Sequence, residues 1–256
     1  MHIDMAPAWR RAKGFLRAGT EFIWPSRSMV SGAPSTAKGT VSPEEWTALS
    51  FLHGTVCRRC GLPQEMDLGE ETVCAACVAR PPRWQAARAA LAYDEASRRP
   101  VLELKRAGRR DGLAVMANWM VQAGHDLLAR NDLIVPVPLH YRRLASRGYN
   151  QAGWLASAVS RQSGLPMRPA ILKRVRSTPT QGGLNPRARR RNVAGAFSVS
   201  PARAGHVAGH RVLLIDDVLT TGATVNGCTR ALLKAGAASV DVLVLARVVR
   251  EHDVTI

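Results

Sequence analysis

Two adjacent carboxylates followed by a threonine-rich segment are the residues of this sequence best suited to chemistry. Asp216 and Asp217 follow an apolar run at residues 212–215, and the sequence TTGAT occupies residues 220–224 ahead of a helical pattern. In α/β proteins, ligands bind beyond the carboxyl ends of parallel strands, and a helix N-terminus offers free N–H groups to a phosphate. Because carboxylates accept hydrogen bonds from vicinal hydroxyls, this order predicts a site for a ribose 5-phosphate group at residues 216–224.

The same residues have a simpler explanation, in which two aspartates end a strand and Thr220 or Thr221 caps the following helix. An isolated pair of aspartates would favour that explanation, but the complete succession of apolar strand, aspartates, TTGAT and helix does not. Neither GxxxxGK[ST] nor GxGxxG occurs in the sequence, so the common nucleotide-binding motifs offer no competing site.

Four of the five cysteines form two closely spaced pairs. Cys57 and Cys60 are separated by two residues, as are Cys74 and Cys77, and 13 residues lie between the pairs. Four thiolates at this spacing can converge on one Zn²⁺ and leave no open coordination position. The pattern therefore predicts one structural zinc ion per chain, with a redox-active pair or a chance spacing as the alternatives.

The second half of the chain alternates apolar strands with helical patterns. We expect strands at residues 133–137, 211–215 and 239–246, and helices at residues 112–130, 151–163 and 224–235. Strands of this length joined through helices form parallel sheets. The sequence therefore predicts an α/β fold, a Rossmann-like parallel sheet with helices on both faces, and no internal repeat is evident.

Composition divides the chain into three regions. Residues 1–50 are irregular, residues 51–82 hold the cysteine pairs, and residues 83–256 hold the regular elements. A short amphipathic helix is expected within residues 9–23. No apolar run reaches the roughly 20 residues that cross a bilayer, and no secretory signal is recognisable, so we expect a cytoplasmic protein without a membrane span.

The chain carries a large positive charge, with 36 Lys and Arg against 19 Asp and Glu and a formal net charge of +17. Such a surplus attracts nucleic acid, anionic lipid or phosphorylated metabolites, although solvated arginines give the same composition. Aromatic residues make up only 5% of the sequence. Their scarcity weakens the case for unspecific single-stranded DNA binding, which uses stacking on aromatic rings.

Three segments together resemble the ComF family. They are VPVPLHYRRLASRGYNQA at residues 135–152, LKRVRSTPTQGGLNPRARRRNVAGAF at residues 172–197, and residues 216–224, which look like the phosphoribosyl pyrophosphate (PRPP) motif of type I phosphoribosyltransferases. The ComF family comprises cytoplasmic bacterial proteins with a zinc-ribbon region before a phosphoribosyltransferase domain, and some members are linked to DNA uptake in natural competence. The resemblance implies a type I phosphoribosyltransferase fold over residues 83–256, preceded by a zinc-ribbon region at residues 51–82.

The resemblance also implies roles for individual residues. Asp216 and Asp217 would be the catalytic pair that faces the ribose hydroxyls of Mg²⁺-bound PRPP. Residues 174–192 would form a flap over the ligand, for which a solvated basic loop or a nucleic-acid contact is the alternative. The residues that bind PRPP around its 5-phosphate would be Val218, Leu219, Thr220, Thr221, Gly222, Ala223 and Thr224. Those of the flap and the pyrophosphate site would be Arg147, Arg174, Arg176, Gln181 and Arg190.

The chain departs from the family pattern upstream, where many members resemble a double zinc ribbon. Ser28, Ser31, Ser42 and Glu45 stand where four further cysteines would be. Because zinc sites use thiolate, imidazole and carboxylate ligands rather than neutral hydroxyls, we expect residues 1–50 to be a degenerate first zinc ribbon, without metal and held by packing alone.

Three functions are compatible with these features. The first is a Mg²⁺-dependent phosphoribosyltransferase that transfers phosphoribosyl from PRPP, or a related ribose phosphate, to an unknown acceptor. The second is a non-catalytic factor that handles single-stranded DNA during DNA uptake, and the third is a ligand-regulated adaptor for partners such as competence proteins. Fold alone does not decide among them, because residues 216–224 predict ligand binding in all three.

Overall fold

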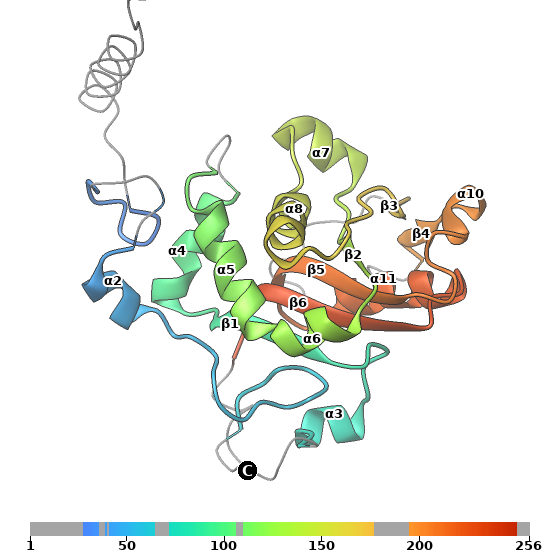
Figure 1. The fold of residues 1–256 in the computed structure, drawn as a ribbon, viewed down its shortest axis with the longest axis horizontal. Helices are drawn as coiled ribbons and strands as arrows, with labels where there is room; N and C mark the ends of the chain where they lie inside the picture. The colour runs from blue at the N-terminus through green and yellow to red at the C-terminus, as the bar shows by residue number, and fades with distance from the viewer. Residues whose placement is uncertain are drawn as a thin grey trace, which may run out of the picture.

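A four-stranded parallel sheet forms the centre of the molecule (Figure 1). The computed structural model describes residues 28–35, 39, 41–64, 72–105, 110–176 and 195–249, without the side chains of residues 142 and 143. The expected helix within residues 9–23 lies outside these ranges. The strand order is β1-β6-β5-β2, with all neighbours parallel and with the bounds β1 Ala87–Ala92, β2 Leu133–Pro136, β5 Arg211–Leu219 and β6 Ser239–Arg247. The predicted α/β fold with a parallel sheet is confirmed.

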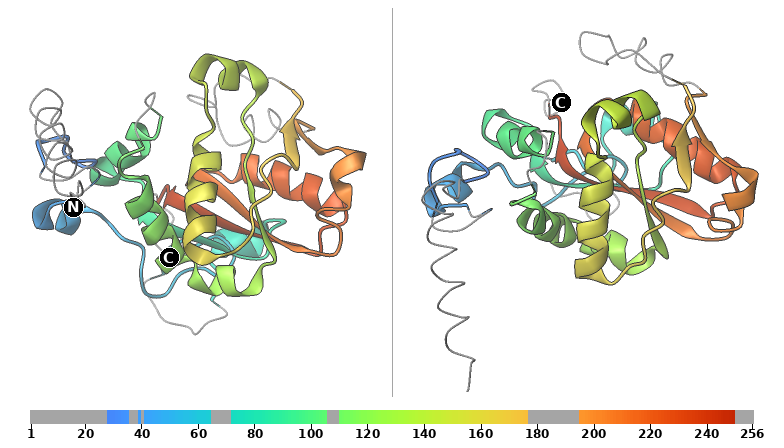
Figure 2. Two further views of the ribbon diagram at one scale, coloured as in Figure 1. Left: turned by 45° about the horizontal axis from the view of Figure 1, so that its top comes forward. Right: turned by 90° about the horizontal axis from the view of Figure 1, so that it is seen from above.

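Helices cover both faces of this sheet because the side chains of its central strands alternate between two apolar cores. Leu213 and Ile215 pack into one core with α5 and α8, while Val212 and Leu214 pack into the other with α11. The two sets of helices lie on opposite sides in Figure 2. The helices of the sheet domain are α4 Glu95–Glu103, α5 Leu113–Ala123, α6 His125–Arg130, α7 Tyr141–Arg147, α8 Gln151–Ser163, α10 Pro201–Ala204 and α11 Ala223–Lys234.

Shorter elements complete the described part of the chain. Upstream of the sheet lie α2 Pro43–Ala48 and α3 Ala75–Ala79, and an antiparallel ribbon of β3 Leu172–Arg174 and β4 Phe197–Val199 packs beside α11. Among the described residues, no helix is both long and apolar enough to cross a membrane.

Two expected elements have different bounds in the structure. The helix expected at residues 112–130 is divided at Gly124, where a Cβ atom would lie 2.7 Å from Cδ1 of Leu243. Close packing of this turn against β6 therefore interrupts the helix. Strand β5 extends to Leu219 instead of ending at residue 215, because its pairing with β6 continues to Arg247.

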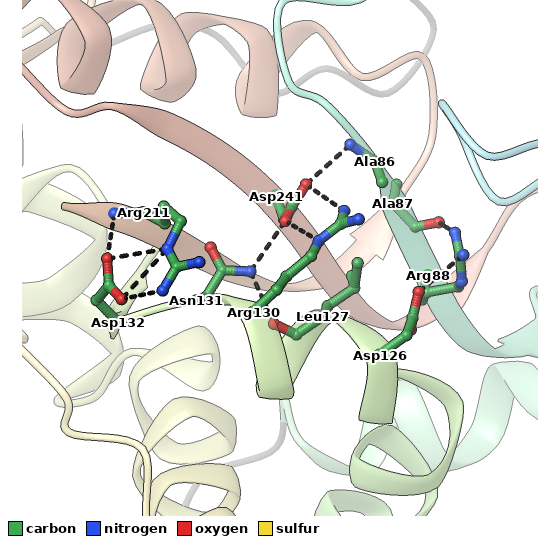
Figure 3. A network of polar contacts seen from close by, with 10 residues as sticks. All are labelled: Ala86, Ala87, Arg88, Asp126, Leu127, Arg130, Asn131, Asp132, Arg211 and Asp241. Carbon is green, nitrogen blue, oxygen red and sulfur yellow. Dashed lines mark hydrogen bonds and ion pairs between the residues drawn. The ribbon is translucent and has the colours of Figure 1, made fainter.

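A buried carboxylate links three segments of the chain near the amino end of β6 (Figure 3). Asp241 in β6 is 2% exposed and accepts two hydrogen bonds of 2.8 Å from the Arg130 guanidinium. It also accepts a bond from the Asn131 side-chain amide at 2.9 Å and one from the backbone N–H of Ala86 at 2.9 Å. These bonds fix α6 and the chain before β1 against β6.

Candidate functional site

A cavity of about 280 Å³ opens beside the carboxyl end of β5. The segments after β2 and β5, the ends of α7 and β3 and the first turns of α8 and α11 surround it, as expected for ligand sites in open parallel sheets. Its cations are Lys105, Arg147 and Arg174, and its carboxylates are Asp216 and Asp217. The remaining lining residues are Val137, Pro138, Leu139, Asn150, Gln151, Ala152, Val218, Leu219, Thr220, Gly222, Ala223, Thr224 and Val225.

The loop between β5 and α11 depends on a glycine at its last position. Gly222 has a φ of +71° and is the N-cap residue of α11, where no side chain caps the helix. The first N–H groups of a helix have no partner within it, so they are suited to an anion. A Cβ atom on Gly222 would lie 2.6 Å from Cη2 of Trp84. Backbone conformation and close packing therefore both favour glycine at this position.

The two aspartates lie within β5, and their carboxylates share the cavity with a lysine. Lys105 at the end of α4 places Nζ 3.3 Å from Oδ2 of Asp217. The half-buried Asp216 accepts a bond of 2.9 Å from the N–H of Asp217, and Asp217 accepts one of 2.8 Å from the N–H of Val218. Burial, and then the adjacent charge of Asp217, hold the pKa of Asp216 well above its ordinary value.

The structure places most, but not all, of the predicted ligand residues in the cavity wall. Arg147 and Arg174 line it, and the Arg174 guanidinium lies 5.4 Å from the centre of the Phe197 ring. Thr221 and Arg176 are described but are not among the lining residues. Gln181 and Arg190, with residues 177–194, lie outside the described part of the chain.

Sequence patterns did not indicate three polar lining residues. Lys105 lies in the turn after α4, far from any motif, so only its tertiary contact with Asp217 identifies it. Asn150 donates to the carbonyl of Val137 at 3.0 Å, and Gln151 is 3% exposed. Both belong to the segment at residues 135–152 that resembles the ComF family. Only that resemblance could have indicated from the sequence that they line the site.

The four paired cysteines come together in a compact, buried cluster. Their sulfur atoms all lie within 4.8 Å of one another, and the Sγ atoms of Cys60 and Cys74 are 3.7 Å apart. All four side chains are at most 8% exposed. Four converging thiols fit a tetrahedral zinc ion. The fifth cysteine, Cys228, belongs to α11, and its side chain is fully buried in the core.

The upstream serines and glutamate also come together, around the carboxylate of Glu45. Ser28 Oγ donates to Glu45 Oε2 at 2.6 Å, and the N–H of Ser31 donates to Oε1 at 3.0 Å. The N–H of Ser42 donates to Oε2 at 2.9 Å. Burial alone would raise the pKa of Glu45, but the hydrogen bonds from Ser28 and Ser31 lower it to about 2. Hydrogen bonds therefore act beside core packing in this region, and the expectation of packing alone was wrong.

The backbones around the two clusters follow one pattern, although the sequence showed no repeat. Ser28 bonds through its N–H to the carbonyl of residue 33, and its carbonyl accepts from Gly32; Cys57 does the same with residue 62 and Gly61. Both glycines have positive φ, +73° and +68°. Ser42 and Cys74 then act as N-cap residues of α2 and α3, with Glu45 and Cys77 three residues later. Corresponding positions thus hold Ser, Ser, Ser and Glu in one cluster and four cysteines in the other.

The chain is similar in sequence to several known proteins. Residues 135–253 match the phosphoribosyl transferase domain family. The "DNA utilization protein YhgH" of Salmonella typhi is 34% identical over 201 residues, which cover 75% of this chain and 84% of that protein. "Competence protein F" of Haemophilus influenzae is 42% identical over 116 residues, covering 45% of this chain and 50% of that one.

Among solved structures, the glutamine PRPP amidotransferase from B. subtilis complexed with ADP and GMP is 21% identical and has a TM-score of 0.36, over 56% of this chain and 30% of that one. This likeness is too weak to bear on function. The parallel sheet, the loop after β5 and the matched domain define a type I phosphoribosyltransferase fold preceded by a four-cysteine cluster. The chain belongs to the ComF family, which includes the YhgH proteins.

Proposed function

We propose that the cavity beside β5 binds Mg²⁺-PRPP, or a related ribose phosphate, and that the chain transfers phosphoribosyl to an acceptor. One observation carries the proposal: the cavity is lined both by Asp216 and Asp217 and by the loop that ends at Gly222. The 5-phosphate would lie against the first N–H groups of α11, favoured by the positive end of the helix dipole. The carboxylates would then accept hydrogen bonds from the ribose hydroxyls.

The chemistry that this site supports is charge stabilisation rather than acid–base catalysis. In the transfer, the bond between the ribose carbon and pyrophosphate breaks, and the acceptor forms a new bond to that carbon. Lys105, Arg147 and Arg174 line the cavity and are suited to neutralise the departing pyrophosphate. Mg²⁺ bound with PRPP would add further neutralisation of the same oxygens. The carboxylates are placed to hold the ribose as its carbon gains positive charge.

Calorimetric titration of Mg²⁺-PRPP into wild type and into the double variant Asp216→Asn/Asp217→Asn tests this proposal. Each charge-assisted hydrogen bond contributes roughly 1.5–3 kcal/mol, so the double variant is expected to bind at least about a hundredfold more weakly. Asp132→Asn is the matched control, because Asp132 pairs with Arg211 at the opposite end of β5. Undetectable binding by folded wild type, or equal affinity in the double variant, would refute the proposal.

Binding is expected to strengthen as pH rises through the pKa of Asp216. Because that pKa is raised, Asp216 keeps its proton above the ordinary aspartate value of about 3.9, and the protonated form is the poorer acceptor. Because the unfolded chain loses this proton at a lower pH, the free energy of unfolding also falls as pH rises from the ordinary pKa to the raised pKa of Asp216. Titrations of wild type and Asp216→Asn between about pH 5 and about pH 8 separate this effect from ionisation of the ligand. Parallel pH profiles for the two proteins would contradict it.

Single-stranded DNA is the second candidate ligand. The curated relatives include a protein named for DNA utilization and one named for competence, and the chain has a formal charge of +17. Phosphate contacts would make DNA affinity fall steeply with salt. Binding that is absent even at low salt would remove this candidate, whereas DNA binding without PRPP binding would make it the leading one. The site would then serve as a binding module for DNA uptake or for competence proteins.

We further propose that the cysteine cluster holds one structural zinc ion per chain. Residues 51–82 would form the zinc-ribbon region and residues 83–256 the phosphoribosyltransferase-type domain. Residues 1–50 would be a degenerate copy of the ribbon. In it, hydrogen bonds to the Glu45 carboxylate would replace metal coordination in holding the serines together. Elemental analysis that finds two zinc ions per chain would contradict this assignment.

A further inference from the structure

Two buried side chains connect the four-cysteine cluster to the loop that we assign to the ribose phosphate. Trp84 and Arg247 are 3% and 8% exposed, respectively. We propose that, through them, an occupied metal site holds the loop in its ligand-binding conformation, with Trp84 as the principal positioning residue. The ligand's identity rests on the proposed function, but the coupling between cluster and loop does not.

Trp84 contacts the cysteine segment at one edge and the loop at the other. Its Nε1 donates to the carbonyl of Arg59 at 2.5 Å, between Cys57 and Cys60 in the chain. The Arg59 guanidinium donates back to the carbonyl of Trp84 at 3.4 Å. The opposite edge of the indole lies against Gly222, where an added Cβ would be 2.6 Å from Cη2. The position of the cysteine turn therefore determines where the indole can lie beneath the loop.

A neighbouring backbone contact extends this connection into α11. The N–H of Arg83 donates to the side-chain oxygen of Asn226 at 3.0 Å, and the N–H of Asn226 bonds to the carbonyl of Gly222 at 2.8 Å. Trp84 also shares a core with Leu219, Ala223 and Val225, which flank the loop on both sides. Movement of residues 83 and 84 would thus displace the first turn of α11, where we place the 5-phosphate.

Arg247 provides a second, independent connection. Its guanidinium donates to Cys60 Sγ at 3.3 Å, where its positive charge suits a metal-bound thiolate. Arg247 is the last residue of β6 and pairs with Leu219, the last residue of β5. The following N–H, of Val248, donates to the carbonyl of Leu219 at 3.0 Å. The cluster is therefore connected through Arg247 to the strand that enters the loop, and through Trp84 to the helix that leaves it.

Coupling of this kind is reciprocal, which gives it a thermodynamic signature. If bound zinc strengthens ligand binding at the loop by some factor, bound ligand must strengthen zinc retention by the same factor. Linked sites typically show factors of roughly 5 to 150, and we expect about tenfold here. A tryptophan that only packs in the core would produce no such link between the two sites.

Hydrogen exchange of the loop tests the coupling without any ligand. The peptide covering residues 219–226 is followed in zinc-loaded wild type, in chelated wild type and in zinc-loaded Trp84→Phe, which keeps an aromatic ring but loses the donor to Arg59. We expect exchange about tenfold faster in the last two proteins. Residues 151–163 in α8 should keep their protection, which shows that the sheet domain stays folded. Trp119→Phe is the matched control, because Trp119 is buried in α5 against Trp46 and Phe51.

Competition of a zinc chelator with and without saturating Mg²⁺-PRPP completes the test. Wild type is expected to retain zinc about tenfold more tightly with PRPP bound, and Trp84→Phe is expected to lose most of this gain. Equal loop exchange in all three proteins would overturn the coupling. If the loop responds to zinc but PRPP does not bind, the coupling stands and only the proposed ligand fails.

Discussion

Replacing Cys77 with serine is expected to reduce the zinc content from one ion per chain to nearly none after dialysis against a chelator. The four sulfur atoms lie within 4.8 Å of one another, so loss of one thiolate leaves a site with three strong ligands. Zinc contributes on the order of 10 kcal/mol to the folding of small structural zinc units. Residues 57–64 and 72–80 should therefore become sensitive to proteases in the variant. Elemental analysis and limited proteolysis measure both effects.

The matched control for this variant is Cys228→Ala. Cys228 is as deeply buried as the cluster cysteines, but it lies in α11 and packs in the core of the sheet domain. The zinc content of Cys228→Ala should therefore equal that of wild type. A wild-type protein that holds no zinc when purified without chelators would contradict the metal assignment. Unchanged zinc in Cys77→Ser would contradict the tetrahedral site.

Replacement of Asp241 with alanine is expected to lower the free energy of unfolding by about 2–4 kcal/mol, because two buried donors lose their acceptor, while the Arg130 side chain, 42% exposed, is still partly solvated. Asp241 is 2% exposed and accepts bonds from Arg130, Asn131 and Ala86. Alanine leaves the N–H of Ala86 and the Asn131 amide without this acceptor in a buried setting. Urea denaturation followed by circular dichroism measures the difference.

Asp132→Ala is the control for this prediction, since it removes a similar contact at the surface (Figure 3). Arg211 donates to Asp132 at 2.7 Å, with side-chain exposures of 54% and 31%. Exposed ion pairs contribute little to stability because water solvates both charges. The loss of unfolding free energy in Asp132→Ala should therefore be several times smaller than that in Asp241→Ala. Similar losses in the two variants would show that the buried network does not stabilise α6 as described.

Local sequence patterns were sufficient to predict those features that depend on residues close together in the chain. The apolar strand, the two aspartates and the glycine before α11 occur in one continuous segment, so the strand, loop and helix were predictable. The four-cysteine cluster was predictable for the same reason, because its spacing alone limits the geometry. Helix α8 has the expected bounds, with Gly164 in the left-handed conformation at its end.

Features that depend on contacts between distant residues were not predictable. Pairing with β6 extends β5 past residue 215, and packing of Gly124 against Leu243 divides a helix. Lys105 joins the site through its contact with Asp217, and Trp84 reaches Gly222 across the fold. The repeated backbone pattern was not predictable either, because the two clusters have different side chains and share only glycine positions and backbone hydrogen bonds.

A crystal structure of the zinc-loaded protein with Mg²⁺-PRPP would test the proposed ligand site. We expect the 5-phosphate to lie against the backbone N–H groups of residues 220–224, with the ribose hydroxyls facing Asp216 and Asp217. Lys105 should then release Asp217 or turn toward the pyrophosphate. PRPP bound at another surface, or crystals grown at saturating PRPP that contain none in this cavity, would contradict the proposed function.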